Sequence, residues 1–219
     1  MGFSYEYALE TVPHILGALG TTLFVTVLSC IGAAALAFLM EFVRRSGRWA
    51  GYSMRFLIDA IRSTPVLVQL YFLFFVLPFY GLTLPPLVVG VMGLSIYFSG
   101  YLAEVFKAGI DAIPQGQWDA AKALHISPWN TIVSVIAPQM LRNIAAPMGN
   151  YFVSILKATP YLAVIAVPEM LGEAFDLASD TFRYAEPILV TGIIFLCLAL
   201  VIAQLVQRLE TSMQKSLKR

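Results

Sequence analysis

Charged residues are scarce in this sequence. Asp, Glu, Lys and Arg together make up 12% of its 219 residues, whereas hydrophobic residues make up 59%. A soluble domain carries about 25% charged residues, so this chain has too little polar surface to cover a globule in water. Its apolar surface therefore needs lipid as a solvent. The net charge of +1 also argues against a nucleic-acid partner, because there is no excess of cations to neutralise phosphates.

Cysteine and histidine are equally scarce, with two residues of each. Cys30 and Cys197 each lie in an apolar run, so we expect two small buried hydrophobic side chains. His14 and His125 stand alone, and no nucleophile has a plausible base beside it. The chain also lacks the Gly-x-x-x-x-Gly-Lys-Ser/Thr phosphate loop of ATPases. We therefore expect no catalytic site, no metal and no cofactor in this chain.

Positive charge is missing from the N-terminal segment 1–14, which carries Glu6 and Glu10. A secretory signal peptide begins with a positive region, so we expect the first apolar run to remain in the mature protein as a span. A span needs about 20 apolar residues to cross a hydrocarbon core of about 30 Å. The predicted spans lie near residues 15–40, 56–79, 84–104, 144–167 and 187–206. The sequence thus predicts an all-α polytopic membrane protein with five transmembrane helices.

The charges outside these spans are unevenly distributed. The 41–55 connection, the 107–142 stretch and the C-terminal tail 210–219, with Arg208 just before it, are rich in Lys and Arg. The 169–186 connection instead holds five acidic residues against Arg183. Because positive loops stay in the cytoplasm, we expect the tail to be cytoplasmic and the N-terminus and the acidic connection to be external. The acidic connection is either a solvated face or a contact for an extracytoplasmic binding protein.

The 107–142 stretch is too long for a simple turn between spans. Pro114 and Pro128 bracket a predicted short helix, since proline starts helices well and cannot continue them. Asp119 is expected near the positive N-terminal end of that helix. A narrow apolar stripe follows helical spacing at Trp118, Ala121 and Leu124 or His125. Such a helix either lies on the membrane or enters a groove of a partner protein.

Several stretches of the chain resemble one family. They are Glu104–Ile110, Pro114–Ala121, Ile136–Gln139, Arg62–Gln69, Lys157–Pro160, Val164–Glu169 and Thr21–Leu23. Together they resemble the EAA loop and spans of binding-protein-dependent ABC importer permeases, most closely the polar amino acid branch. The resemblance covers about residues 19–209. It implies a type I ABC importer transmembrane domain over residues 15–209, in the bacterial cytoplasmic (inner) membrane, that carries amino acids or similar small polar zwitterionic solutes.

The same resemblance implies partners. The EAA loop of the family forms a coupling helix that docks on a dimer of cytoplasmic ABC ATPases, which hold ATP and Mg²⁺. A second permease, identical or paralogous, and an extracytoplasmic solute-binding protein complete the importer in the lipid bilayer. The coupling residues implied here are Gly116, Trp118, Asp119, Ala120, Ala121, Leu124 and His125. This chain departs from the family pattern at Asp119, usually Glu, at His125, usually a Gly of positive φ, and at Ala137, usually Leu.

Lys157 lies within the fourth predicted span, where a lysine costs about 2.5–3.5 kcal/mol on insertion scales. It is an ion-pair or carbonyl partner of another span, a cation lining a water-filled path, or a side chain that snorkels to the interface. Pro160 cannot donate a hydrogen bond to the carbonyl of Leu156, which is then free for a ligand or water. The candidate path residues are Lys157, Thr159, Gln69, Ser95, Tyr97, Asn150, Tyr151 and Ser154. For each uncharged residue of this set other than Thr159, helix packing is favoured over a ligand contact.

Two further features bear on substrate and stability. Many amino acid permeases carry an acidic residue where this chain has Ala158, which argues against arginine or lysine as the solute, while betaine-like and ectoine-like solutes remain open. Arg62 is expected to pair with Asp59 on its own helix or with Glu104 across the bundle. An ion-coupled secondary carrier and a non-transporting scaffold are the alternative functions, although a carrier usually has more spans and inverted repeats.

Overall fold

The computed structural model describes residues 2–215, with the side chains of residues 209, 210 and 212–215 left aside. Every element in this range is helical. The α-helices are α1 (Tyr5–Gly17), α2 (Leu19–Arg45), α3 (Arg48–Ser63), α4 (Val66–Tyr71), α5 (Pro86–Asp111), α6 (Gln115–Ala123), α7 (Pro128–Asn130), α8 (Ala137–Ala158), α9 (Met170–Thr181) and α10 (Ala185–Lys215). Wider π-helical turns occupy η1 (Phe72–Val76) and η3 (Thr131–Ile136), and tighter 3₁₀ turns occupy η2 (Leu77–Tyr80) and η4 (Thr159–Ile165).

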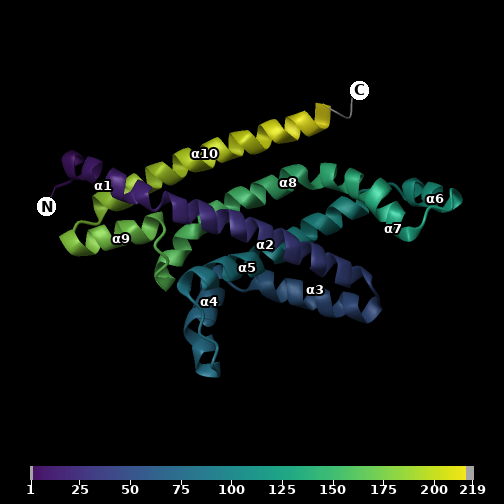
Figure 1. Ribbon diagram of the computed structural model, residues 1–219, viewed down its shortest axis with the longest axis horizontal. Coiled ribbons are helices and arrows are strands. Elements are labelled where there is room, and N and C mark those ends of the chain that lie inside the picture. The colour runs from purple at the N-terminus through teal and green to yellow at the C-terminus, as the bar shows by residue number, and fades with distance from the viewer. Residues whose placement is uncertain (1, 216–219) are drawn as a thin grey trace.

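Three helices, α2, α5 and α10, are long and apolar enough to cross a membrane. Two bent pairs raise the number of candidate spans to five, with bends of 100° between α3 and the segment Val66–Tyr80 and of 41° between Pro128–Ile165 and α9. The all-α polytopic prediction is therefore confirmed. In Figure 1 the long helices run roughly along one axis, with α6 and α7 at the end opposite the N-terminus.

The predicted second span, 56–79, is not one straight helix. Pro65 holds the preceding Thr64 in an extended conformation, with φ −99° and ψ 130°, and α3 ends there. The chain then restarts as α4, and the arm Val66–Tyr80 leaves the bundle at 100° to α3 (Figure 1). The first predicted span is also shifted, because the chain breaks at Ala18 and Ile15 belongs to the separate helix α1.

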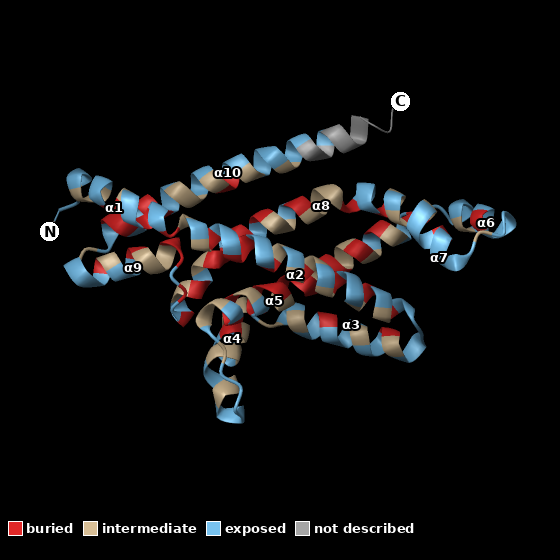
Figure 2. Ribbon diagram, viewed as in Figure 1, coloured by how far each residue is buried: buried red, intermediate tan, exposed pale blue. Residues whose placement is uncertain are grey.

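The core of the bundle lies between α2 and α5. Small residues let their backbones approach, as is usual for helices packed in lipid: a Cβ added at Gly32 of α2 would lie 2.4 Å from Oγ of Ser95 on α5. Figure 2 shows this buried seam in red, while the outer faces of α2 and α10 are exposed. Cys197 lies exposed on α10 and Cys30 is partly buried against the core, so the prediction of two buried cysteines is wrong for Cys197 and only partly met by Cys30.

A smaller core joins α1 to α9 and α10 through Ile15, Met170 and Ala174. The chain's first turn is also fastened there, because the Ser4 amide donates to Glu186 Oε1 over 3.0 Å. The predicted N-terminal segment is thus mostly helix, packed against α9 of the acidic connection and against α10, which follows it.

Candidate functional site

The predicted short helix between the prolines exists as α6, with Pro114 as its N-cap. Trp118 is half-buried and Ala121 is buried, so these two side chains face the bundle. Leu124 is 73% exposed, and Gly116, Asp119, Ala120 and His125 are exposed as well. The predicted apolar stripe is therefore divided: its first half anchors α6, and its end faces outward.

The C-terminus of α6 has the geometry that a glycine usually supplies. His125 adopts a left-handed φ of 54°. Its amide donates to the Lys122 carbonyl over 2.9 Å, and the Ile126 amide donates to the Ala121 carbonyl over 3.0 Å. These two bonds form a Schellman motif. The histidine therefore keeps the backbone turn of the family's glycine, at the cost of a left-handed conformation for a residue with a Cβ.

Asp119 lies one turn further into α6 than expected. The first turn of the helix contains no acidic residue, so the predicted favourable interaction with the helix N-terminus is not found. Instead the Gln115 side-chain amide donates to Asp119 Oδ1 over 3.2 Å at the exposed surface. The other oxygen of the carboxylate remains on a solvent-facing surface, where a partner protein can reach it.

A chain of alternating charges joins α2 to the end of α5, just before α6. Arg44 donates through Nε to Glu41 over 2.6 Å, through Nη1 to Glu104 over 2.5 Å, and through Nη2 to the Ala103 carbonyl over 3.1 Å. Arg44 is only 8% exposed and Glu41 only 2%. Glu104 therefore pairs with Arg44. The alternative prediction, a pair between Glu104 and Arg62, is wrong.

The chain of charges continues through Arg45 at the rim. Its Nε donates to Glu41 over 2.5 Å and its Nη2 to Asp111 over 2.6 Å, and Lys107 lies 3.3 Å from the same Asp111 carboxylate. Arg62 instead lies 4.0 Å from Asp59 on its own helix and 5.4 Å from the ring centre of Tyr101. Six alternating charges thus tie α2 to the last turns of α5.

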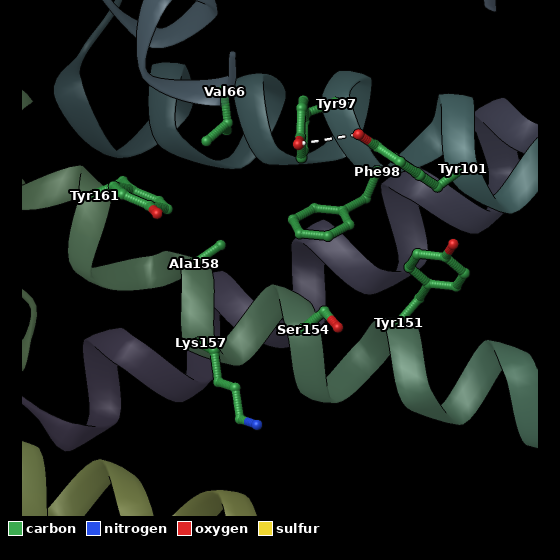
Figure 3. A pocket seen from close by; sticks show the side chains of 9 residues that line it. All are labelled: Val66, Tyr97, Phe98, Tyr101, Tyr151, Ser154, Lys157, Ala158 and Tyr161. Carbon is green, nitrogen blue, oxygen red and sulfur yellow. Dashed lines mark hydrogen bonds between the residues drawn. The ribbon is translucent and has the colours of Figure 1, made fainter. Parts of the chain in front are cut away.

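A second candidate site is an open pocket of about 420 Å³ where α5, α8 and η4 meet. We call it the tyrosine pocket, and its lining is Val66, Tyr97, Phe98, Tyr101, Tyr151, Ser154, Lys157, Ala158 and Tyr161. The hydroxyls of Tyr97 and Tyr101 lie 3.1 Å apart (Figure 3). None of the lining residues is acidic, so the polar groups offered to a ligand are hydroxyls and one ammonium.

Four of the eight predicted path residues line this pocket: Tyr97, Tyr151, Ser154 and Lys157. The other four do not. Ser95 is buried against Gly32, and the Gln69 amide donates to the carbonyls of Ile61 and Thr64. Asn150 is exposed outside the pocket. Sequence reasoning missed Tyr101 and Tyr161, although the four-residue spacing of Tyr97 and Tyr101 places both on one helix face.

Thr159 is fully buried, and its hydroxyl donates to the Leu156 carbonyl over 2.9 Å. The Thr159 amide donates to the same oxygen. The expectation of a free Leu156 carbonyl at Pro160 is therefore wrong, because the residue before the proline supplies both hydrogen bonds.

Lys157 is exposed and makes no ion pair within the part of the chain that the structure describes. In the view of Figure 3 its side chain extends from α8 on the side away from Tyr97 and Val66. Of the three interpretations of this residue, pairing with another span thus finds no support among the described residues. A cation at the edge of a water-accessible space fits its position.

Residues 33–215 match the family described as "Binding-protein-dependent transport system inner membrane component". The chain belongs to this family. It is 37% identical over 210 residues to a probable amino-acid ABC transporter permease protein, y4tG, of Sinorhizobium fredii, with 95% of this chain and 91% of the relative covered. It is 30% identical over 217 residues to the glutamine transport system permease protein GlnP of Escherichia coli, with 98% and 99% covered.

Solved structures agree with this membership. The fold superposes on a chain of a crystal structure of an amino acid ABC transporter with histidines at a TM-score of 0.89 and 29% identity, covering 97% of this chain and 100% of that one. A chain of the MetNI methionine ABC transporter shares the fold, with a TM-score of 0.79 at 14% identity. The protein is therefore a multi-pass inner-membrane permease subunit of an ABC importer, a transport component, and the secondary-carrier and scaffold alternatives are set aside.

Proposed function

We propose that this permease imports a neutral, zwitterionic amino acid or a similar small polar solute, and that the tyrosine pocket is part of its path. The observation that carries the proposal is the chemistry of the pocket, whose lining offers hydroxyls and no carboxylate, with Lys157 at its edge. A solute carboxylate can meet the ammonium, and its polar groups can meet the hydroxyls. Ala158 lines the pocket where an acidic residue would favour a cationic side chain.

Coupling is assigned to α6. Its exposed surface around Asp119 and Leu124 docks on a separate cytoplasmic ATPase dimer, which binds and hydrolyses ATP with Mg²⁺. Trp118 and Ala121 attach α6 to the bundle, so movement of the ATPase is passed to α5. A second permease, this chain or a paralogue, closes the open side of the pocket, and a solute-binding protein delivers the solute from outside.

The orientation follows from charge. The N-terminal segment 1–14 is external, the transmembrane domain covers residues 15–209, and the tail 210–219 is cytoplasmic together with α6. In support, α6 and the C-terminal end of α10 lie toward the same end of the molecule, opposite the N-terminus (Figure 1). The last tail residues, 216–219, which include Lys218 and Arg219, lie outside the described residues.

Two experiments test these assignments. The tagged chain, purified in mild detergent, should recover an ATPase with a phosphate-loop motif, and a variant with residues 118–124 scrambled should not. Recovery of the chain alone, stable and monomeric, would contradict the docking role. In proteoliposomes of the complete importer, unlabelled glutamine should compete with the imported solute more strongly than arginine does. Equal competition by arginine would contradict the neutral-solute assignment.

A further inference from the structure

A second cavity lies where α6 joins the bundle, with a volume of about 290 Å³. We call it the Trp118 cavity, and its lining comes from α2, α5, α6, η3, α8 and the residue that follows α2. These residues are Phe38, Glu41, Phe42, Arg45, Ser46, Phe106, Ile110, Trp118, Ile132, Ile136, Ala137 and Met140. Nine of the twelve are apolar. The cavity thus lies directly against the side chain that anchors the coupling helix, and neither the fold nor the tyrosine pocket accounts for it.

The three polar residues of the lining lie together at the end of α2. Glu41 is held by Arg44 and Arg45, so its charge is compensated. Arg45 uses Nε and Nη2 for Glu41 and Asp111, while its Nη1 has no hydrogen-bond partner within the described residues. The Arg45 side chain is 43% exposed. One edge of this guanidinium therefore remains free for an anion at the polar end of an otherwise apolar cavity.

The mouth of the cavity continues a lipid-facing stripe of α2. Phe38 is 55% and Phe42 64% exposed. Together with the exposed Phe24, Leu28, Ile31 and Ala35 they form one stripe at alternating four- and three-residue spacing on the same helix. In a membrane protein a stripe of this kind faces acyl chains, and an apolar cavity that opens on it is filled from the bilayer and not from water.

We propose that the Trp118 cavity binds one phospholipid, with an acyl chain in the apolar part and the phosphate at Nη1 of Arg45. The inference rests on the cytoplasmic position of α6 proposed above, which puts Arg45 at headgroup level, where Arg binds phosphate through its planar fork of donors. The acyl chain packs against Trp118 from the bundle side. The lipid thereby becomes a structural support of the coupling helix.

The test uses Trp118 as a reporter. The chain has three tryptophans, so the double variant Trp49→Phe, Trp129→Phe leaves Trp118 as the fluorophore. In nanodiscs made with phospholipid brominated on its acyl chains, Trp118 emission should be quenched. Adding Ala137→Phe, which fills the cavity from α8, should remove most of the quenching. Ala203→Phe, which adds the same ring on the exposed face of α10 outside the cavity, should leave it unchanged.

A second measurement detects the bound lipid directly and needs no fluorophore. Native mass spectrometry of the full chain after stepwise delipidation should find one phospholipid held longest, lost in both Ala137→Phe and Arg45→Met but kept in Ala203→Phe. Absence of quenching of Trp118, or equal quenching with the cavity filled, would overturn the proposal. Protection of Trp118 from quenching when the ATPase partner is added would also overturn it, because a protein side chain would then fill the cavity. None of these measurements needs transport, so their failure is separate from failure of the coupling assignment.

Discussion

Two regions of this chain treat charge in opposite ways. At the junction of α2 and α5, six alternating charges from Glu104 to Lys107 are linked, and the central Arg44 makes three different contacts. At the tyrosine pocket, the Lys157 ammonium is exposed and has no ion pair within the described residues. A charge placed in a membrane bundle is costly, so a paired one is best explained by structure and an unpaired one by function.

The largest effect is expected on stability when Arg44, the centre of the paired region, is removed. Arg44→Met leaves the buried Glu41 with Arg45 alone and takes away the partner of Glu104, and loss of one partner of a buried pair costs about 3–5 kcal/mol. We expect a clear fall in the thermal midpoint of the detergent-purified chain. Arg48→Met is the matched control, because Arg48 is exposed and has no ion pair in the described part of the chain, and it should change stability by less than about 0.5 kcal/mol. Equal effects of the two variants would contradict the structural role.

Removing the unpaired charge should lower the import rate and leave stability unchanged. Lys157→Met should leave membrane insertion and the thermal midpoint unchanged but lower the import rate about tenfold or more, because a charge-assisted hydrogen bond to the solute is worth about 1.5–3 kcal/mol. Import by proteoliposomes of the complete transporter measures this. Asn150→Ala is the control, since Asn150 lies on the same helix outside the pocket. Wild-type import by the lysine variant would remove Lys157 from the path.

A weaker effect is expected when one hydroxyl of the pocket is removed and the aromatic ring that carries it is kept. Tyr101→Phe keeps the ring but removes the hydroxyl that lies against Tyr97 and donates to the Arg62 carbonyl. Loss of one hydroxyl contact to the solute should cost about 0.5–1.5 kcal/mol. We expect a few-fold rise in the solute concentration needed for half-maximal import, with the maximal rate unchanged. Tyr52→Phe, an exposed tyrosine of α3 remote from the pocket lining, should change neither quantity. A loss of maximal rate alone would argue for a structural role of this hydroxyl.

The smallest expected effect concerns the end of α6. His125→Gly relieves the left-handed conformation, worth about 1–2 kcal/mol for a residue with a Cβ, but gives back part of this through a more flexible unfolded chain. We expect a net gain of roughly 0.5 kcal/mol in the free energy of unfolding, measured by thermal denaturation. His125→Val should lose stability, because a β-branched residue tolerates this conformation least. The reverse order of the two variants would contradict the assigned helix end.

Hydropathy predicted the long apolar helices and failed where local geometry or packing between helices decides. The spans around α2, α5 and α10 follow from composition, and the proline bracket predicted α6. A span count averages over residues, so it passed over the bend that Pro65 imposes on Thr64. Sequence spacing relates residues on one helix but not between helices. Glu104 was therefore given Arg62 as a candidate partner, while Arg44, 60 positions earlier, holds it.

In the candidate sites, too, the sequence indicates single polar residues but not how these residues are placed between helices. Tyr97 and Lys157 stood out as polar residues in apolar runs, which is a signal the sequence carries directly. Thr159 carried the same signal, yet its hydroxyl satisfies the Leu156 carbonyl and faces no pocket. The difference lies in which side of the helix faces the bundle, and that depends on tertiary packing.

The most direct test of the account is ATP hydrolysis by the reconstituted importer in the presence of its loaded solute-binding protein. Asp119→Ala should abolish the stimulation by loaded binding protein, because it removes the exposed carboxylate through which we propose that α6 meets the ATPase. Lys122→Ala, an exposed neighbour on the same helix, should keep most of it. Full stimulation in the Asp119 variant, with the complex intact, would contradict the claim that α6 couples this permease to its ATPase through Asp119.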